Sequence, residues 1–135
     1  MNAQLADAFA CGELVRPMPE EPNLVHLVRA LGTLSGAKGL DEYAATRSLM
    51  ELIGPAEHYL FILLDGLGMN LLRQLPGDWF LAKHLKTQIQ SSCPSTTASA
   101  LTSVATGQWP AQHAITGWFT HLPEFGLTAT ILPFT

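Results

Sequence analysis

The sequence predicts an α/β domain with parallel strands, and two strand–turn–helix units indicate it. Residues 59–64 (YLFILL) form a continuous apolar run between turn-forming residues. Such a run is typical of a strand that is buried on both faces of a parallel sheet. Residues 87–92 (TQIQSS) can form a second strand, and a helical pattern follows each run. This alternation favours a βαβ organisation, and without a repeat or linker we expect one domain or part of one.

The first 58 residues are expected to form an arm and two helices. Residues 1–21 are weakly patterned and end in RPMPEE, so we interpret them as an arm and begin the domain (residues 22–135) at Pro22. The first helix should start at Pro22 or Asn23 and end near Gly32 to Gly39. Its apolar stripe is Leu24, Leu27, Val28 and Leu31. The second should be capped by Asp41 and stopped by Gly54. Its inner residues would be Tyr43, Leu49, Met50, Leu52 and Ile53.

The segments after the first strand are mostly helical by pattern. Two short helices are expected within residues 69–75 and 79–85, the second capped by Asp78. A longer helix should open at Thr96 or Thr97, run to about Thr106 and stop at Gly107. Its predicted inner stripe is Ala98, Leu101 and Ala105. From residue 117 onward, aromatic and β-branched alternation around residues 123–126 predicts a β-hairpin.

Composition excludes some classes of partner. The net charge is −4, so we expect no nucleic-acid partner. No apolar run approaches the roughly 18 residues of a membrane span, and the first residues lack a signal-peptide pattern. We therefore predict a cytoplasmic protein without a membrane partner. Cys11 and Cys93 are the only cysteines, and we interpret both as reduced thiols, with Cys93 packed as a small apolar residue.

The end of the chain suggests a longer protein. The sequence is 47% hydrophobic and 13% charged, and it stops at the apolar segment ATILPFT. Further strands and helices would cover such a surface. We therefore expect the N-terminal portion of an α/β domain whose sheet is incomplete at the C-terminus. Expressed alone, it should be loosely packed and inactive.

Two polar positions stand where an α/β domain binds ligands. Asp65 is the first charge after the apolar run, followed by Gly66 and Gly68. Ligands gather at the carboxyl ends of parallel strands, so this carboxylate is placed to hold a cation or a phosphate group. Thr97 lies at a helix N-terminus, where free N–H groups and the helix dipole favour a phosphate. We expect both at one sheet edge, with side-chain oxygens within roughly 4–5 Å.

These residues carry a family resemblance. Residues 94–115 (PSTTASALTSVATGQWPAQHAI), with ILLDG at residues 62–66, resemble the type I phosphodiesterase/nucleotide pyrophosphatase branch of the alkaline phosphatase superfamily. The resemblance covers about residues 60–135. It implies a doubly wound, mostly parallel α/β domain and two divalent metal ions, usually zinc. It also implies hydrolysis of a phosphodiester or pyrophosphate, with a small phosphoester as the substrate.

The resemblance also assigns roles by position. Asp65 would be a metal ligand, and Thr97 would be both a metal ligand and the nucleophile. Coordination to a metal lowers the pKa of a threonine hydroxyl, which is otherwise a poor nucleophile. The backbone amide of Ala98 would hold a phosphoryl oxygen. Trp118 stands where many nucleotide pyrophosphatases have asparagine, and it is our candidate to line the substrate pocket. Ala114 replaces the usual glycine of a His-Gly-Ile segment.

Alternative interpretations remain at each position. Asp65 can be a simple turn cap, and Thr96 is the fallback nucleophile. His113 is expected to be a hydrogen-bonded structural residue rather than a ligand. Trp109 is expected in the core, and for Trp118 a place in the core is the alternative to the pocket. For the whole chain, the alternatives are a non-catalytic module that binds an anion or nucleotide, and a pseudoenzyme of the same fold.

Overall fold

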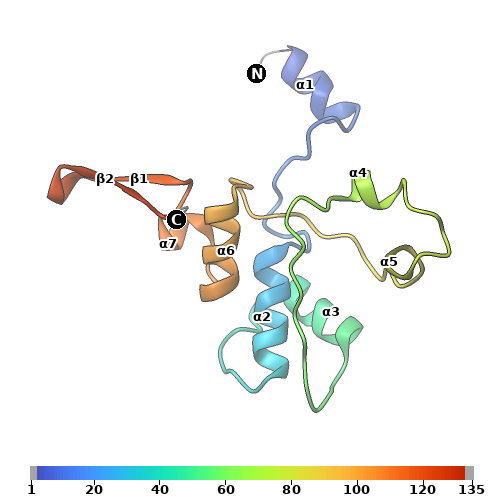
Figure 1. Cartoon of the computed structure of the whole chain (residues 1–135). Coiled ribbons are helices and arrows are strands. Elements are labelled where there is room, and N and C mark those ends of the chain that lie inside the picture. Colours follow the sequence, from blue (N-terminus) through green and yellow to red (C-terminus); the bar gives the residue numbers. More distant parts are fainter. Residues whose placement is uncertain (1–2, 133–135) are drawn as a thin grey trace.

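The computed structural model describes residues 3–132, which form seven α-helices, one 3₁₀ helix and a two-stranded sheet (Figure 1). The helices are α1 (Ala3–Ala10), α2 (Leu24–Leu34), α3 (Ala44–Ile53), α4 (Met69–Leu72), α5 (Phe80–Lys83), α6 (Thr97–Thr106) and α7 (Pro110–His113). The strands are β1 (Phe119–Leu122) and β2 (Leu127–Thr130), with the 3₁₀ turn Pro123–Phe125 between them. The C-terminal end that we expected to be uncovered, residues 133–135, lies outside the described residues.

The predicted first helix is present as α2, and Asn23 begins it. The Asn23 side-chain oxygen accepts hydrogen bonds from the backbone N–H groups of Val25 (3.0 Å) and His26 (3.3 Å). These N–H groups have no partner inside the helix, so the cap satisfies them. The predicted stripe is partly wrong: Leu24 is buried, but Leu27, Val28 and Leu31 are half-buried. The buried residues of α2 are Leu24, Val25, His26, Arg29 and Ala30.

Helix α3 packs against α2 and ends where its glycine predicted. Gly54 follows the helix at φ +76°, a conformation that side chains disfavour. The helix starts at Tyr43 rather than Asp41, and no side chain caps it. Leu49 is buried as predicted, whereas Leu52 and Ile53 are exposed and line an open cavity that Leu64 also borders.

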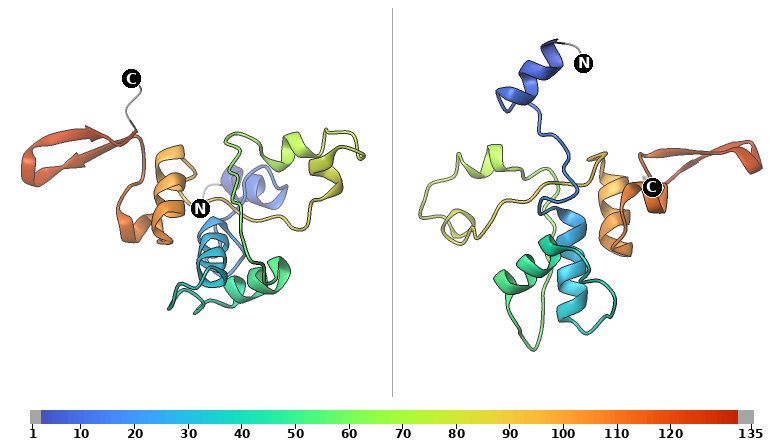
Figure 2. Two further views of the ribbon diagram at one scale, coloured as in Figure 1. Left: turned by 60° about the horizontal axis from the view of Figure 1, so that its bottom comes forward. Right: turned by 180° about the vertical axis from the view of Figure 1, so that it is seen from behind.

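Helix α6 also has its predicted boundaries. Thr96 caps it by accepting a hydrogen bond from the N–H of Ser99 (3.4 Å), and Gly107 ends it at φ +64°. Its buried face is Ala98, Ser99 and Ser103, while the predicted inner residues Leu101 and Ala105 are exposed. This buried face consists of small side chains, and α6 lies beside α2 (Figures 1 and 2).

The two predicted parallel strands do not form among the described residues. Residues 59–64 are extended but unpaired, and residues 87–92 make a single parallel bridge, between Gln90 and Asn23. A strand satisfies its backbone groups only through a neighbouring strand, and neither run has one here. The doubly wound parallel sheet therefore stays a prediction.

The remaining elements lie around the three-helix core. The predicted hairpin is confirmed, with Phe119 opposite Thr130 and Leu122 opposite Leu127. The short helices α4 and α5 are present, although α5 starts after Trp79 rather than at an Asp78 cap. Helix α1 was not predicted; good helix formers in AQLADAFA explain it, and no residue of it is buried. Within residues 3–132, no helix has the length and apolar character needed to cross a membrane.

Candidate functional site

Asp65 lies on a turn between the extended residues 59–64 and helix α4. The turn includes a long hydrogen bond from the Leu67 N–H to the Leu64 carbonyl oxygen (3.4 Å). Gly66 has φ +75°, which explains why a glycine follows the aspartate. The carboxylate is exposed, so it is free to meet a ligand from solvent.

Thr97 is the first residue of α6, and its neighbour does the capping. Because Thr96 accepts the bond from Ser99, the Thr97 hydroxyl is left for another partner. That hydroxyl donates a hydrogen bond to Oδ2 of Asp65 at 3.2 Å. The two side-chain oxygens, 32 positions apart in sequence, thus lie within the expected distance, though not at the edge of a parallel sheet.

The pair offers oxygen donors of the kind that zinc, magnesium and manganese accept. One carboxylate and one hydroxyl are a partial set, since a catalytic zinc has three protein ligands. Within residues 3–132, no group of three or more His, Cys, Asp or Glu side chains is placed to hold a metal ion. The arrangement therefore fits one side of a metal site and leaves the other ligands to be supplied.

The two predicted substrate contacts are placed differently. Ala98 is fully buried, so its amide is not open to solvent in this conformation. Trp118 is half-buried at the base of the hairpin, where its carbonyl oxygen accepts a hydrogen bond from the N–H of Ile131 (2.9 Å). Both roles stay predictions.

His113 has the structural contacts that we expected. Its Nδ1 accepts a hydrogen bond from the N–H of Ile115 (3.1 Å), which leaves Nε2 as the donor to the Ser103 hydroxyl (3.0 Å). The ring therefore joins α7 to the buried face of α6. Ala114, which ends α7, has φ +63°, so the residue that replaces a family glycine is held in the conformation that glycine favours.

An apolar cavity of about 380 Å³ lies beside the loop that leads to Thr97. Its walls include Tyr43, Cys93 and Trp109. Cys93 is therefore an exposed free thiol, not the packed residue that we expected, because its loop borders this cavity. Trp109 packs edge-on against His26 (ring centroids 5.2 Å apart), consistent with a core role.

His26 is a buried titratable group that the sequence did not single out. Its ring lies between Tyr43 and Trp109, at centroid distances of 5.3 and 5.2 Å. Burial lowers the pKa of His26 below its ordinary value, and the charge of Arg29 lowers it further. A histidine within an apolar helical stripe gives no local signal of this environment.

A comparison with models of known protein families shows to which family the chain belongs. The family model described as "Type I phosphodiesterase / nucleotide pyrophosphatase" matches residues 59–127, slightly more than half of the chain. The chain belongs to this family. The match includes both Asp65 and Thr97, and the family lies in the alkaline phosphatase superfamily. Neither the curated proteins nor the solved structures gave a match.

Membership supports a hydrolase-type function on phosphoesters or nucleotides. The family is generally metal-dependent. Its alkaline phosphatase-like α/β fold agrees with the strand–helix pattern of the sequence, while the described residues contribute helices and one hairpin.

Proposed function

We propose that this chain carries the nucleophile side of an active site that hydrolyses a phosphodiester or pyrophosphate. Thr97 is the attacking group, and Asp65 holds a divalent metal ion, with zinc expected. The single observation that carries the proposal is the 3.2 Å contact between the Thr97 hydroxyl and the Asp65 carboxylate. Family membership supplies the reaction class.

Each residue has a distinct task in this proposal. The Asp65 carboxylate brings negative charge to the cation and, before a cation binds, orients the threonine by accepting its proton in a hydrogen bond. The Thr97 hydroxyl, at the positive end of α6, gives its proton to solvent water, and its oxygen attacks phosphorus while the P–O bond to the leaving alcohol or phosphate breaks. Water then hydrolyses the resulting threonine phosphoester, which releases the phosphate product and restores the hydroxyl. Two bound divalent ions would lower the pKa of the nucleophile and stabilise the attacking and leaving oxygens.

The cap arrangement supports Thr97 over Thr96 as the nucleophile. The Thr96 hydroxyl accepts from a backbone N–H that otherwise has no partner, so withdrawing it would uncap α6. The Thr97 hydroxyl does not cap the helix, so its reaction would leave the end of α6 intact.

The proposal is tested with the complete gene product, because the described residues bring only two donors together. We expect the 135-residue chain alone to show no zinc-dependent hydrolysis. In the complete product, Asp65→Asn should lower both zinc content and hydrolysis of bis(4-nitrophenyl) phosphate. Thr97→Ala should abolish hydrolysis and leave the zinc content largely intact.

Asp78→Asn is the matched control, since Asp78 is another exposed aspartate on a turn before a short helix. It should change neither property. An Asp65→Asn variant with normal zinc content and turnover would refute the metal role. Tight binding of nucleotide without any turnover would favour the non-catalytic binding module instead.

A further inference from the structure

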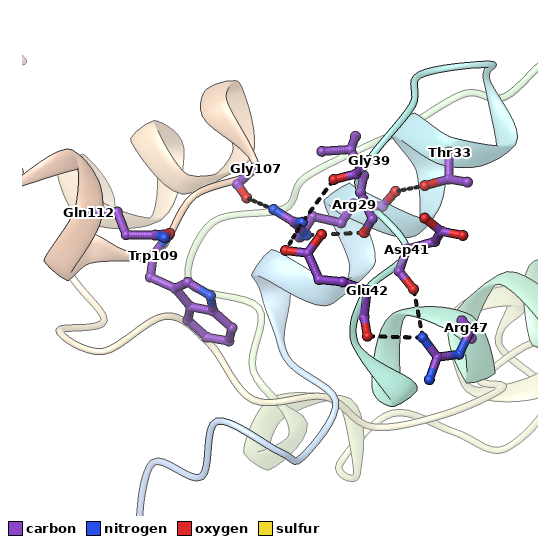
Figure 3. Close-up of polar contacts among 10 residues, drawn as sticks. Arg29, Thr33, Gly39, Asp41, Glu42, Arg47, Gly107, Trp109 and Gln112 are labelled. Atoms are coloured by element: carbon purple, nitrogen blue, oxygen red, sulfur yellow. Dashed lines mark hydrogen bonds and ion pairs between the residues drawn. The ribbon is translucent and has the colours of Figure 1, made fainter.

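Arg29 of α2 is a buried cation whose guanidinium joins three segments (Figure 3). Its Nη1 donates to the carbonyl oxygen of Gly107 and its Nε to that of Leu40, both at 3.1 Å. It also forms an ion pair with Glu42. A buried charge is costly unless such partners compensate it, so these contacts fix the guanidinium in place.

The contact with Gly107 fixes one end of α6. Gly107 ends the helix in the left-handed conformation, and its N–H bonds to the Ser103 carbonyl oxygen. A Cβ at Gly107 would lie 3.6 Å from Cγ of Arg29, so the arginine packs directly against this turn. Helix α6 therefore has its C-terminal end attached to α2, while Thr97 lies at its other end.

The segment before α6 is also attached to the start of α2. The N–H of Leu24 donates to the carbonyl oxygen of Gln90, and the N–H of Gln90 donates to that of Pro22, both at 2.9 Å. The stretch that carries Thr97 is thus held by α2 on both sides. Both attachments use residues of the region that precedes the family match at residue 59.

We propose that Arg29 is a positioning residue for Thr97: by fixing the far end of α6 it keeps the Thr97 hydroxyl beside Asp65. The exposed hydrogen bond between these two side chains is too weak on its own to orient a helix. Helix α6 is rigid and roughly 15 Å long, so a small rotation about Gly107 moves Thr97 appreciably. The catalytic meaning of this inference rests on the proposed function.

Arg47 of α3 supplies a matched control. It is an exposed arginine whose Nη1 donates to the carbonyl oxygens of Asp41 (2.8 Å) and Glu42 (2.9 Å), on the loop that Arg29 also contacts (Figure 3). Among the described residues it makes no hydrogen bond to α6. Arg47→Met therefore removes comparable bonds from the same loop without touching the attachment of α6.

The test reads the environment of Thr97 directly in the complete gene product. Threonine methyl groups are labelled with ¹³C, and Asp65→Asn defines the methyl signal of Thr97 without its partner. We expect Arg29→Met and Arg29→Lys to move the Thr97 signal toward that position. Arg47→Met should leave it unchanged. The signal of Thr46, which is buried in α3, reports whether each variant remains folded.

If the Arg29→Met variant unfolds, the Arg29→Lys variant still tests whether Arg29 positions Thr97. Lysine keeps a cation near Glu42, but its single ammonium cannot reproduce the fork that reaches Gly107 and Leu40. In turnover assays, Arg29→Lys should lower kcat roughly 10- to 100-fold, with KM within about twofold of the parent. A KM effect without a kcat effect would overturn the positioning role.

An unchanged Thr97 signal in the folded Arg29 variants would also overturn the inference, as would an equal change in Arg47→Met. The proposed function fails by a different result. If Thr97→Ala keeps full turnover while the Arg29 variants still move the Thr97 signal, the attachment of α6 stands and the nucleophile is another residue.

Discussion

The packed helices and the segment that connects them differ in how their backbones are satisfied. Helices α2, α3 and α6 carry most of the buried side chains, whereas within the described structure no residue from 54 to 91 is buried. A helix satisfies its backbone hydrogen bonds from its own sequence, so it needs only one covered face. The extended residues 59–64 could satisfy their backbone groups only beside neighbouring strands, and within the described structure their apolar side chains are largely exposed.

The candidate site spans both regions. Thr97 belongs to the packed part, through α6, and Asp65 to the open part, on a turn among exposed residues. One partner of the pair is therefore held by a folded core and the other by a local turn. Further strands beside residues 59–64 would fix Asp65 in the way that α2 already fixes Thr97.

The largest expected effect separates two neighbouring threonines of the packed part. Thr97→Ala should lower turnover of an aryl phosphodiester at least roughly 1,000-fold, because it removes the attacking oxygen. Thr96→Ala should keep turnover within a fewfold and lower the free energy of unfolding by about 1 kcal/mol, because it removes the helix cap. Steady-state kinetics and urea denaturation of both variants measure the two effects. The reverse pattern would shift the nucleophile to Thr96.

A pair of leucines tests the contrast between the regions. Leu49 in α3 is 3% exposed, and Leu60 in the extended segment is 85% exposed. We expect Leu49→Ala to lower the free energy of unfolding by about 2–4 kcal/mol, since it leaves a cavity in the core. In the 135-residue chain, Leu60→Ala should stay within about 0.5 kcal/mol. Urea denaturation followed by circular dichroism measures both, and similar losses would show that residues 59–64 are packed in solution.

The sequence predicted the elements whose signals are local. Asn23, Thr96 and Gly107 mark helix ends, and the start of α2 and both ends of α6 followed from them within a residue or two. Hydrophobic periodicity did not identify the inward faces, because the buried face depends on the neighbour. Leu101 is exposed while Ser103 is buried, since α6 meets α2 and α7 through small side chains.

The candidate site was also predicted only in part from the sequence. The proximity of Asp65 and Thr97 followed from a resemblance between two short segments, not from any periodicity. Arg29 was not predictable, because its partners are the backbone carbonyl groups of Gly107, Leu40 and Gly39, which any residue type can supply. Its ion-pair partner Glu42 is thirteen positions away, beyond any local pairing pattern.

The stability of the packed part should depend on pH through His26. The lowered pKa of His26 in the folded state means that the unfolded chain, with an ordinary pKa near 6.5, binds the proton more readily. The neutral, buried His26 therefore contributes its full share to the free energy of unfolding above about pH 6.5. That share is lost as the pH falls toward the folded-state pKa of His26. Urea midpoints measured from pH 8 to pH 5 should decrease, and His26→Phe should flatten the decrease.

His58 provides the control for this pH dependence, because it lies in the open part and is exposed. His58→Gln should leave the slope of stability against pH unchanged. An equal loss of slope in His26→Phe and His58→Gln would place the titrating group elsewhere.

The smallest expected effect concerns Ala114, which ends α7 at φ +63°. A left-handed conformation costs a residue with a Cβ about 1 kcal/mol or more relative to glycine. Glycine also makes the unfolded chain more flexible, which offsets part of the gain. Ala114→Gly should therefore raise the free energy of unfolding by roughly 0.5 kcal/mol.

The matched control is Ala111→Gly, inside the same short helix, which should lower stability because glycine is a poor helix former. The Ala114 N–H bonds to the Pro110 carbonyl oxygen at 2.9 Å, and this bond does not depend on the side chain. A gain at residue 114 with a loss at residue 111 would show that α7 keeps this turn in solution. If Ala114→Gly is destabilising, the turn adopts another conformation, and the contact between His113 and Ser103 would change with it.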